Sequence, residues 1–338
     1  MNVKLRAVKL TSLPVTCRGL LILPHVTSPP FSDNLDIRHL TDSHSAFYLT
    51  SYTISSSVES AAAKAAQDIA SIHFAFPSVT SDHVVLLMSA WFAYLCAVDD
   101  EVESMEPETA TEALSRTIEM LRTGSRDLSP ISKSVQGMAK LDALTKAFEQ
   151  QMRAFLTLPQ YYKITQLVAD VWQAMLEEIV LRATPHPTIT DTTYMDIRSQ
   201  TVGLAPFFWL LRSALPPSPT ANPTPPRLAD QLAELQTTVA RLTGLQNDLL
   251  GLRKDLAVAE SANIVLVKAA RSEGQHLEEA VEETVQMHNA LVARTLRLRA
   301  KIAAESPGEG CTMGFVDEVV GFVERHFAWA SRAERYCC

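Results

Sequence analysis

Apolar residues recur at helical spacing along almost the whole chain from about residue 57 onward. Alternating strand patterns and Asn-Gly hairpin turns are nearly absent. Gly203 and Pro206 lie inside one helical stretch and are expected to break it. The pattern predicts an all-α fold, a single bundle of about ten or more helices that can enclose a cavity. The expected helices cover residues 58–74, 82–100, 108–121, 131–156, 159–182, 190–212, 228–256, 262–271, 277–304 and 313–336.

Residues 1–54 fall outside this pattern. The first 32 residues contain four basic and no acidic side chains, and the apolar run 19–23 is too short for a secretory signal. We expect a poorly ordered leader here, with a weak transit signal as the alternative. Residues 214–226 are rich in proline and predict an extended surface loop. Because candidate functional residues lie on both sides of this loop, residues 55–338 are expected to form one domain.

Composition narrows the function classes. Hydrophobic residues make up 47% of the 338 residues, charged residues 20%, and the formal net charge is −8. No stripe of Lys and Arg with interleaved aromatic residues is present, so a nucleic-acid partner is not expected. No apolar run is long enough to span a bilayer, so stable membrane insertion is not expected either. The five cysteines fit neither a zinc site nor a disulfide framework, which favours a reducing, cytoplasmic location.

The first candidate site is an acidic cluster after an apolar helix. The segment 91–98 runs directly into Asp99, Asp100, Glu101 and, after Val102, Glu103. Asp99 and Glu103 are four residues apart and share one helix face, where like charges repel. Such a cluster is stable when it is solvated or when it binds a cation. Mg²⁺ prefers oxygen ligands and commonly uses one or two carboxylates together with substrate phosphates. An exposed helix end is the competing interpretation.

The second candidate site lies on the predicted helix 228–256. Asn247, Gly251 and Asp255 recur every four residues and therefore share a face over two turns. Asn247 offers a carbonyl oxygen, Asp255 a carboxylate, and Lys254 can reach a phosphate oxygen. The competing interpretation is the polar face of an ordinary amphipathic helix.

Together the two segments resemble the paired metal-binding motifs of class I terpene synthases, and most closely those of fungal sesquiterpene synthases. Residues 99–103 are similar to the aspartate-rich motif, with Glu in the last place. Residues 247–255 are similar to the family's Asn-Asp-x-x-Ser-x-x-Lys-Glu motif, with Gly and Asp in the Ser and Glu places. Gly251 has no side-chain oxygen, so we expect a water in that place. The resemblance implies metal ligation at Asp99, Glu103, Asn247, Gly251 and Asp255.

Two further elements of the family have counterparts here, and the resemblance extends over about residues 55 to 338. Arg198 precedes the second motif in a matching context, which implies a sensor for the diphosphate. The break at Gly203 implies that a backbone carbonyl near Val202 turns toward the substrate. Arg335 and Tyr336 match the family's Arg-Tyr pair near the C-terminus.

The implied activity is that of a carbon–oxygen lyase of secondary metabolism. Mg²⁺, three ions with Mn²⁺ as the alternative, would neutralise a prenyl diphosphate, and its ionisation would give an allylic cation that cyclises. For a chain of this size the resemblance favours farnesyl diphosphate and a monomer or homodimer. Arg198, Arg335 and Tyr336 have implied catalytic roles. The implied substrate-binding residues are Arg198, Lys254, Arg335, Tyr336, Phe92, Trp329 and Val202.

Two alternatives stay open at this point. A trans-prenyltransferase shares the helical bundle and the diphosphate chemistry, but it carries a second aspartate-rich motif and requires isopentenyl diphosphate. A non-catalytic helical binding protein that keeps the fold would explain the departures at Gly251 and Asp255.

Overall fold

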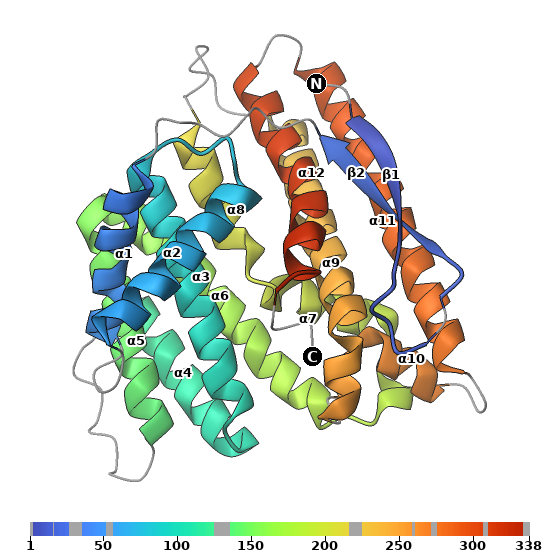
Figure 1. The fold of residues 1–338 in the computed structure, drawn as a ribbon, viewed down its shortest axis with the longest axis horizontal. Helices are drawn as coiled ribbons and strands as arrows, with labels where there is room; N and C mark the ends of the chain where they lie inside the picture. Colours follow the sequence, from blue (N-terminus) through green and yellow to red (C-terminus); the bar gives the residue numbers. More distant parts are fainter. Residues whose placement is uncertain are drawn as a thin grey trace. The chain divides into compact units, whose positions relative to one another are not determined.

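The computed structural model describes residues 3–15, 17–26, 36–51, 57–124, 136–215, 225–258, 261–271, 276–306 and 310–333. These residues form twelve α-helices, one short 3-10 helix and two β-strands, which confirms the predicted all-α class. The described chain divides into two compact units (Figure 1). The first unit comprises Pro30–Ile179 and Gly203–Ala214, and the second comprises Met1–Pro29, Val180–Val202 and Leu215–Cys338.

The first unit is built around α3. This helix packs against neighbours within the unit, and it is long and apolar enough to cross a membrane by length and composition. Of its most apolar part, 67% is buried inside the protein, as expected for a core helix. The helices of this unit are α1 (Ile37–Ser51), α2 (Val58–Ala75), α3 (Asp82–Glu103), α4 (Pro107–Thr123), α5 (Gln136–Phe155), α6 (Leu158–Arg182, whose last turn belongs to the second unit) and α8 (Leu204–Ala214).

Aromatic side chains fill the centre of this unit. Trp91 and Tyr94 on α3 are fully buried. The Tyr94 ring stacks on Phe148 of α5 with ring centroids 4.7 Å apart, and it meets Trp172 of α6 edge to face at 5.3 Å. Because each ring buries a large apolar area and pairs in a favourable geometry, this cluster fixes α3 between α5 and α6.

Helix α1 was not predicted. Its sequence is rich in Ser, Thr and His, which are weak helix formers. Tertiary contacts stabilise it instead, because His44 Nε2 lies 3.0 Å from Asp68 Oδ2 of α2 and the Tyr48 hydroxyl donates to the same carboxylate. These buried polar contacts join α1 to α2.

The second unit is centred on α9, which packs against both α11 and α12 (Figure 1). Pro226 occupies the first turn of α9, where its missing N–H leaves no helical hydrogen bond unmade. Most of the predicted loop 214–226 lies outside the described residues. The elements of this unit are β1 (Val3–Lys9), β2 (Leu20–Val26), η1 (His186–Thr188), α7 (Asp191–Thr201), α9 (Pro226–Ala257), α10 (Ile264–Arg271), α11 (Leu277–Glu305) and α12 (Gly310–Ala330).

The N-terminal segment differs from the poorly ordered leader predicted for residues 1–54. Strands β1 and β2 pair antiparallel, with Val3 opposite Val26, and β2 packs on α11 and α12 (Figure 1). Leu21 and Leu23 of β2 are buried in this contact. The Asn289 side chain of α11 completes the outer edge of β2, because its Oδ1 accepts from Ile22 N and its Nδ2 donates to Leu20 O, both at 2.8 Å. The hairpin is therefore stabilised by contacts that are distant in sequence.

Candidate metal-binding site

The first acidic cluster forms the last turn of α3. This helix continues through the cluster and ends at Glu103, and no basic residue lies in its last turn. The C-terminus of a helix carries a partial negative charge, which disfavours carboxylates there by about 0.3–1 kcal/mol each. The carboxylates of the cluster therefore lie where the helix dipole disfavours negative charge, and they also repel one another. A bound cation would offset both effects.

The members of this cluster have different surroundings. Glu101 accepts a hydrogen bond from Lys140 of α5, so its charge is paired within the first unit. Asp99 is half-buried and Glu103 is exposed, and the two share one face of α3. Phe92 lies about two turns earlier on the same helix and is half-buried. The roles of Asp99 and Glu103 as metal ligands and of Phe92 in substrate binding stay predictions.

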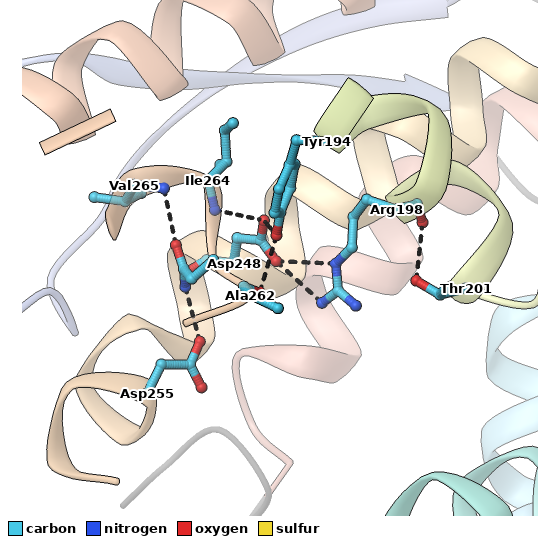
Figure 2. A network of polar contacts seen from close by, with 9 residues as sticks. Tyr194, Arg198, Thr201, Asp248, Asp255, Ala262, Ile264 and Val265 are labelled. Carbon is cyan, nitrogen blue, oxygen red and sulfur yellow. Dashed lines mark hydrogen bonds and ion pairs between the residues drawn. The ribbon is translucent and has the colours of Figure 1, made fainter. Parts of the chain in front are cut away.

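The second motif lies near the C-terminal end of α9, and Asp248 is its most buried charged member. Its carboxylate is 1% exposed. Arg198 Nε of α7 donates to Asp248 Oδ1 at 3.0 Å, and Arg198 Nη2 forms an ion pair with the same oxygen at 3.0 Å. The Tyr194 hydroxyl donates to Oδ2 at 2.6 Å and Ile264 N donates to the same oxygen at 3.2 Å (Figure 2). One carboxylate therefore joins α7, α9 and α10.

Opposing effects set the pKa of Asp248. Burial raises the pKa of its carboxyl, whereas the Arg198 charge, the Tyr194 hydroxyl and the Ile264 N–H favour the ionised form. Gly244, one turn before Asp248, lets Arg198 pass close to α9, because a Cβ at this position would lie 2.8 Å from Arg198 Cγ. The ion pair with Asp248 and the close approach to Gly244 thus fix the direction of the Arg198 side chain.

Asn263, just before α10, connects Asp248 with the predicted ligand Asp255. Its Nδ2 donates to the backbone oxygen of Asp248 and to Asp255 Oδ2, both at 2.8 Å. The Asn263 side chain is buried, whereas Asp255 is half-buried. The last predicted ligand on α9 is therefore held by a residue outside the motif.

A second buried network holds α9 immediately before Asn247. Gln246 Nε2 donates to Val323 O at 3.1 Å and lies 3.2 Å from His288 Nε2, while Gln246 Oε1 lies 2.7 Å from His326 Nδ1. Burial lowers the pKa of His288 to about 4 and that of His326 to about 3, so both rings are neutral near pH 7. Neutral rings fit the contacts, because the His326 N–H donates to an oxygen and His288 Nε2 accepts from an amide.

The predicted helix break is confirmed. Helix α7 ends at Thr201, α8 begins at Leu204, and Gly203 between them has φ +67°. The Trp91 indole N–H donates to Gly203 O at 2.9 Å. A side chain at Gly203 would meet Leu95 Cδ2 at 2.7 Å, so both the backbone conformation and the available space favour glycine.

The predicted site residues fall into three groups. The first unit carries Asp99, Glu103 and Phe92 on α3. The second unit carries Arg198 on α7, Val202 at its C-terminal cap, Asn247, Gly251, Lys254 and Asp255 on α9, and Trp329 on α12. Arg335 and Tyr336 lie outside the described residues, and α12 ends at Ala330, before the predicted residue 336.

Sequence reasoning missed the residues that support Arg198, Asp255 and the helix α9. These are Tyr194, Gly244, Gln246, Asp248 and Asn263. Asp248 alone carried a usable signal, because it stands three residues after Leu245 and four before Leu252, on the apolar face of α9. A carboxylate on such a face requires partners inside the protein.

Comparison with known proteins identifies the family. A family model described as terpene synthase family 2, C-terminal metal binding, matches residues 90–294, more than half of the chain. The chain belongs to terpene synthase family 2. The matched range contains both motifs and Arg198, so the network around Asp248 lies within the part of the chain that the family model covers. No curated protein sequence matches the chain significantly.

Solved structures of terpene synthases share the fold. A hedycaryol synthase in complex with nerolidol superposes with a TM-score of 0.63 at 16% identity, over 91% of this chain and 99% of that one. The linalool/nerolidol synthase from Streptomyces clavuligerus in complex with 2-fluorogeranyl diphosphate gives 0.65 at 17% identity, over 87% and 98%. The SVS_A2 protein from ancestral sequence reconstruction gives 0.64 at 19% identity, over 90% of both chains. At these identities the likeness shows the all-α class I terpene synthase fold.

Proposed function

We propose that this terpene synthase ionises and cyclises a linear prenyl diphosphate, farnesyl diphosphate, to a sesquiterpene in a Mg²⁺-dependent reaction. The observation that carries the proposal is that one metal-binding family match spans both acidic motifs. The network around Asp248 supports it, because a family-typical Arg and the second motif are joined by a buried carboxylate.

The residues present fit divalent metal ions. The oxygen ligands of the two motifs suit Mg²⁺, and the C-terminal end of α3, where the helix dipole disfavours carboxylates, favours a cation. We assign Asp99 and Glu103 to one set of ligands and Asn247 and Asp255 to the other, with a water at Gly251. Three Mg²⁺ ions, with Mn²⁺ as a substitute, are the proposed metal complement. Asp99 and Glu103 belong to the first unit, and Asn247 and Asp255 belong to the second.

The chain's own residues would bind the diphosphate and protect the cation. Bound Mg²⁺ would neutralise the negative charge that develops on the leaving diphosphate. Asp248 directs Arg198, whose other N–H groups bind diphosphate oxygens together with Lys254, Arg335 and Tyr336. The backbone carbonyl near Val202 faces the substrate. Phe92 and Trp329 stabilise the allylic cation by cation–π attraction, worth about 2 kcal/mol when desolvated.

The neighbours support a prenyl diphosphate substrate. One of them contains 2-fluorogeranyl diphosphate and another contains nerolidol. Farnesyl diphosphate is proposed over the shorter geranyl and the longer geranylgeranyl diphosphate. A cytoplasmic location is proposed, because the spacing of the five cysteines fits neither a zinc site nor a disulfide framework. A monomer or homodimer is the proposed state.

Three variants test the ligand assignment. Asp99→Asn and Asn247→Ala each remove a proposed metal ligand and should lower kcat/KM for farnesyl diphosphate by about 10²-fold or more. Glu101→Gln is the matched control, because Glu101 is engaged by Lys140, and it should lower kcat/KM by less than about tenfold. Circular dichroism should show unchanged helicity in all three. Equal losses in all three variants would contradict the assignment, and a requirement for isopentenyl diphosphate would indicate a prenyltransferase.

A further inference from the structure

The Asn263 side chain makes three hydrogen bonds inside the protein. It is 0% exposed. Its Oδ1 accepts from Val265 N at 2.9 Å, which caps the N-terminus of α10. Its Nδ2 donates one hydrogen to Asp248 O and the other to Asp255 Oδ2. One buried amide therefore caps one helix and holds a carboxylate of another.

Asp255 needs such support for two physical reasons. It lies in the last turns of α9, where the helix dipole does not favour a carboxylate. It is also only half-buried, so packing alone leaves its χ angles free to change. The Asn263 contact selects one orientation and fixes it relative to the α9 backbone, because Nδ2 also binds Asp248 O.

We propose that Asn263 is a positioning residue that orients the Asp255 carboxylate for Mg²⁺, an inference that rests on the proposed function. Hydrogen bonds behind a metal ligand commonly contribute 10- to 100-fold to metal affinity. Asn263 acts only through Asp255 and touches neither metal nor substrate. A purely structural role would confine Asn263 to capping α10, and metal affinity would then not depend on it.

Asn263→Ser separates the two roles. Serine is as good an N-cap residue as asparagine, so the hydroxyl keeps the cap of α10 while the donor to Asp255 is lost. Asn263→Thr, which fills more of the vacated volume, serves as the second variant should the serine variant fold poorly. Asn289→Ser is the matched control, because it removes a bridging amide in the same unit that contacts β2 instead of Asp255.

The experiment is calorimetric titration of Mg²⁺ in the presence of inorganic diphosphate, with the full chain. Asn263→Ser should weaken Mg²⁺ binding 10- to 100-fold, and Asn289→Ser should change it less than twofold. In turnover assays the half-activating Mg²⁺ concentration should rise by the same factor as the loss of affinity, and saturating Mg²⁺ should restore kcat.

A double-mutant cycle tests the route of the effect. If Asn263 acts through Asp255, Asn263→Ser should weaken Mg²⁺ binding no further in an Asp255→Ala background. Additive losses of Mg²⁺ affinity in the double mutant would overturn the positioning role, and so would an unchanged Mg²⁺ affinity in Asn263→Ser and Asn263→Thr. In both cases the proposed function would stand if the wild type binds Mg²⁺ and cyclises farnesyl diphosphate. Absence of Mg²⁺-dependent diphosphate binding in the wild type would overturn both the proposed function and this inference.

Discussion

Replacing Asp248 by Asn tests the network that organises the second motif. The substitution keeps the shape of the side chain and removes its charge. It leaves the Arg198 guanidinium, which is 21% exposed, without its counter-charge and places an amide among donors. Removing one partner of a buried ion pair destabilises a protein by about 3–5 kcal/mol. Because Arg198 keeps some contact with solvent, we expect a loss near the lower end, about 3 kcal/mol.

The same two helices provide a matched control. Arg241 of α9 and Asp196 of α7 form a second Asp–Arg pair, with Nη2 only 2.6 Å from Oδ1. Asp196 is 52% exposed, so solvent screens the pair in spite of its shorter distance. Exposed pairs contribute about 0–1 kcal/mol, and Asp196→Asn should therefore reduce the free energy of unfolding by less than about 1 kcal/mol.

Urea unfolding at pH 7, followed by circular dichroism, measures both losses. The prediction is a difference of about 2 kcal/mol or more between Asp248→Asn and Asp196→Asn. Losses that agree to within about 0.5 kcal/mol would refute the reasoning that burial, and not contact distance, decides the contribution of these pairs.

Two further predictions concern stability. Gly203→Ala should reduce the free energy of unfolding by about 2–3 kcal/mol, because it combines left-handed backbone strain with a clash against Leu95, whereas Gly124→Ala (φ +63°, nearest atom at 3.6 Å) should cost only about 1–2 kcal/mol; equal thermal shifts would contradict this. Lowering the pH from 7 to 5 should destabilise the protein, since the unfolded chain binds protons on His288 and His326 below about pH 6.5 and the native state does so only near pH 4 and 3. The free energy of unfolding should fall by about 2 kcal/mol per histidine at pH 5. If urea unfolding gave the same free energy of unfolding at both pH values, His288 and His326 would not be buried as neutral rings.

The spacing of apolar residues predicted the helices from α2 onward, but it did not predict β1, β2 or α1. Most helix positions followed from apolar spacing, including the break at Gly203. The β1–β2 hairpin has a long connection, residues 10–19, and it depends on Glu282 and Asn289 of α11, which lie more than 260 residues later. Such contacts leave no trace in a local window, which is why residues 1–54 were predicted as a leader.

The sequence predicts candidate ligands for the site, but not the contacts that support them. Spacing identified Asp99, Asn247 and Asp255 as candidate oxygen ligands. Asn263 supports Asp255 from a position outside the motif, and its type and spacing are common in loops before helices. Only the fold brings Asn263 Nδ2 to Asp255, so its role follows from the structure.

The central claim is Mg²⁺-dependent cyclisation of farnesyl diphosphate. Gas chromatography with mass detection should analyse products formed from farnesyl diphosphate alone, with Mg²⁺ and after removal of Mg²⁺ by chelation, beside parallel reactions with geranyl and geranylgeranyl diphosphate. The account predicts a cyclic sesquiterpene from farnesyl diphosphate that disappears when Mg²⁺ is removed. Absence of any product from farnesyl diphosphate in the presence of Mg²⁺, or a product that persists without the metal, would contradict it.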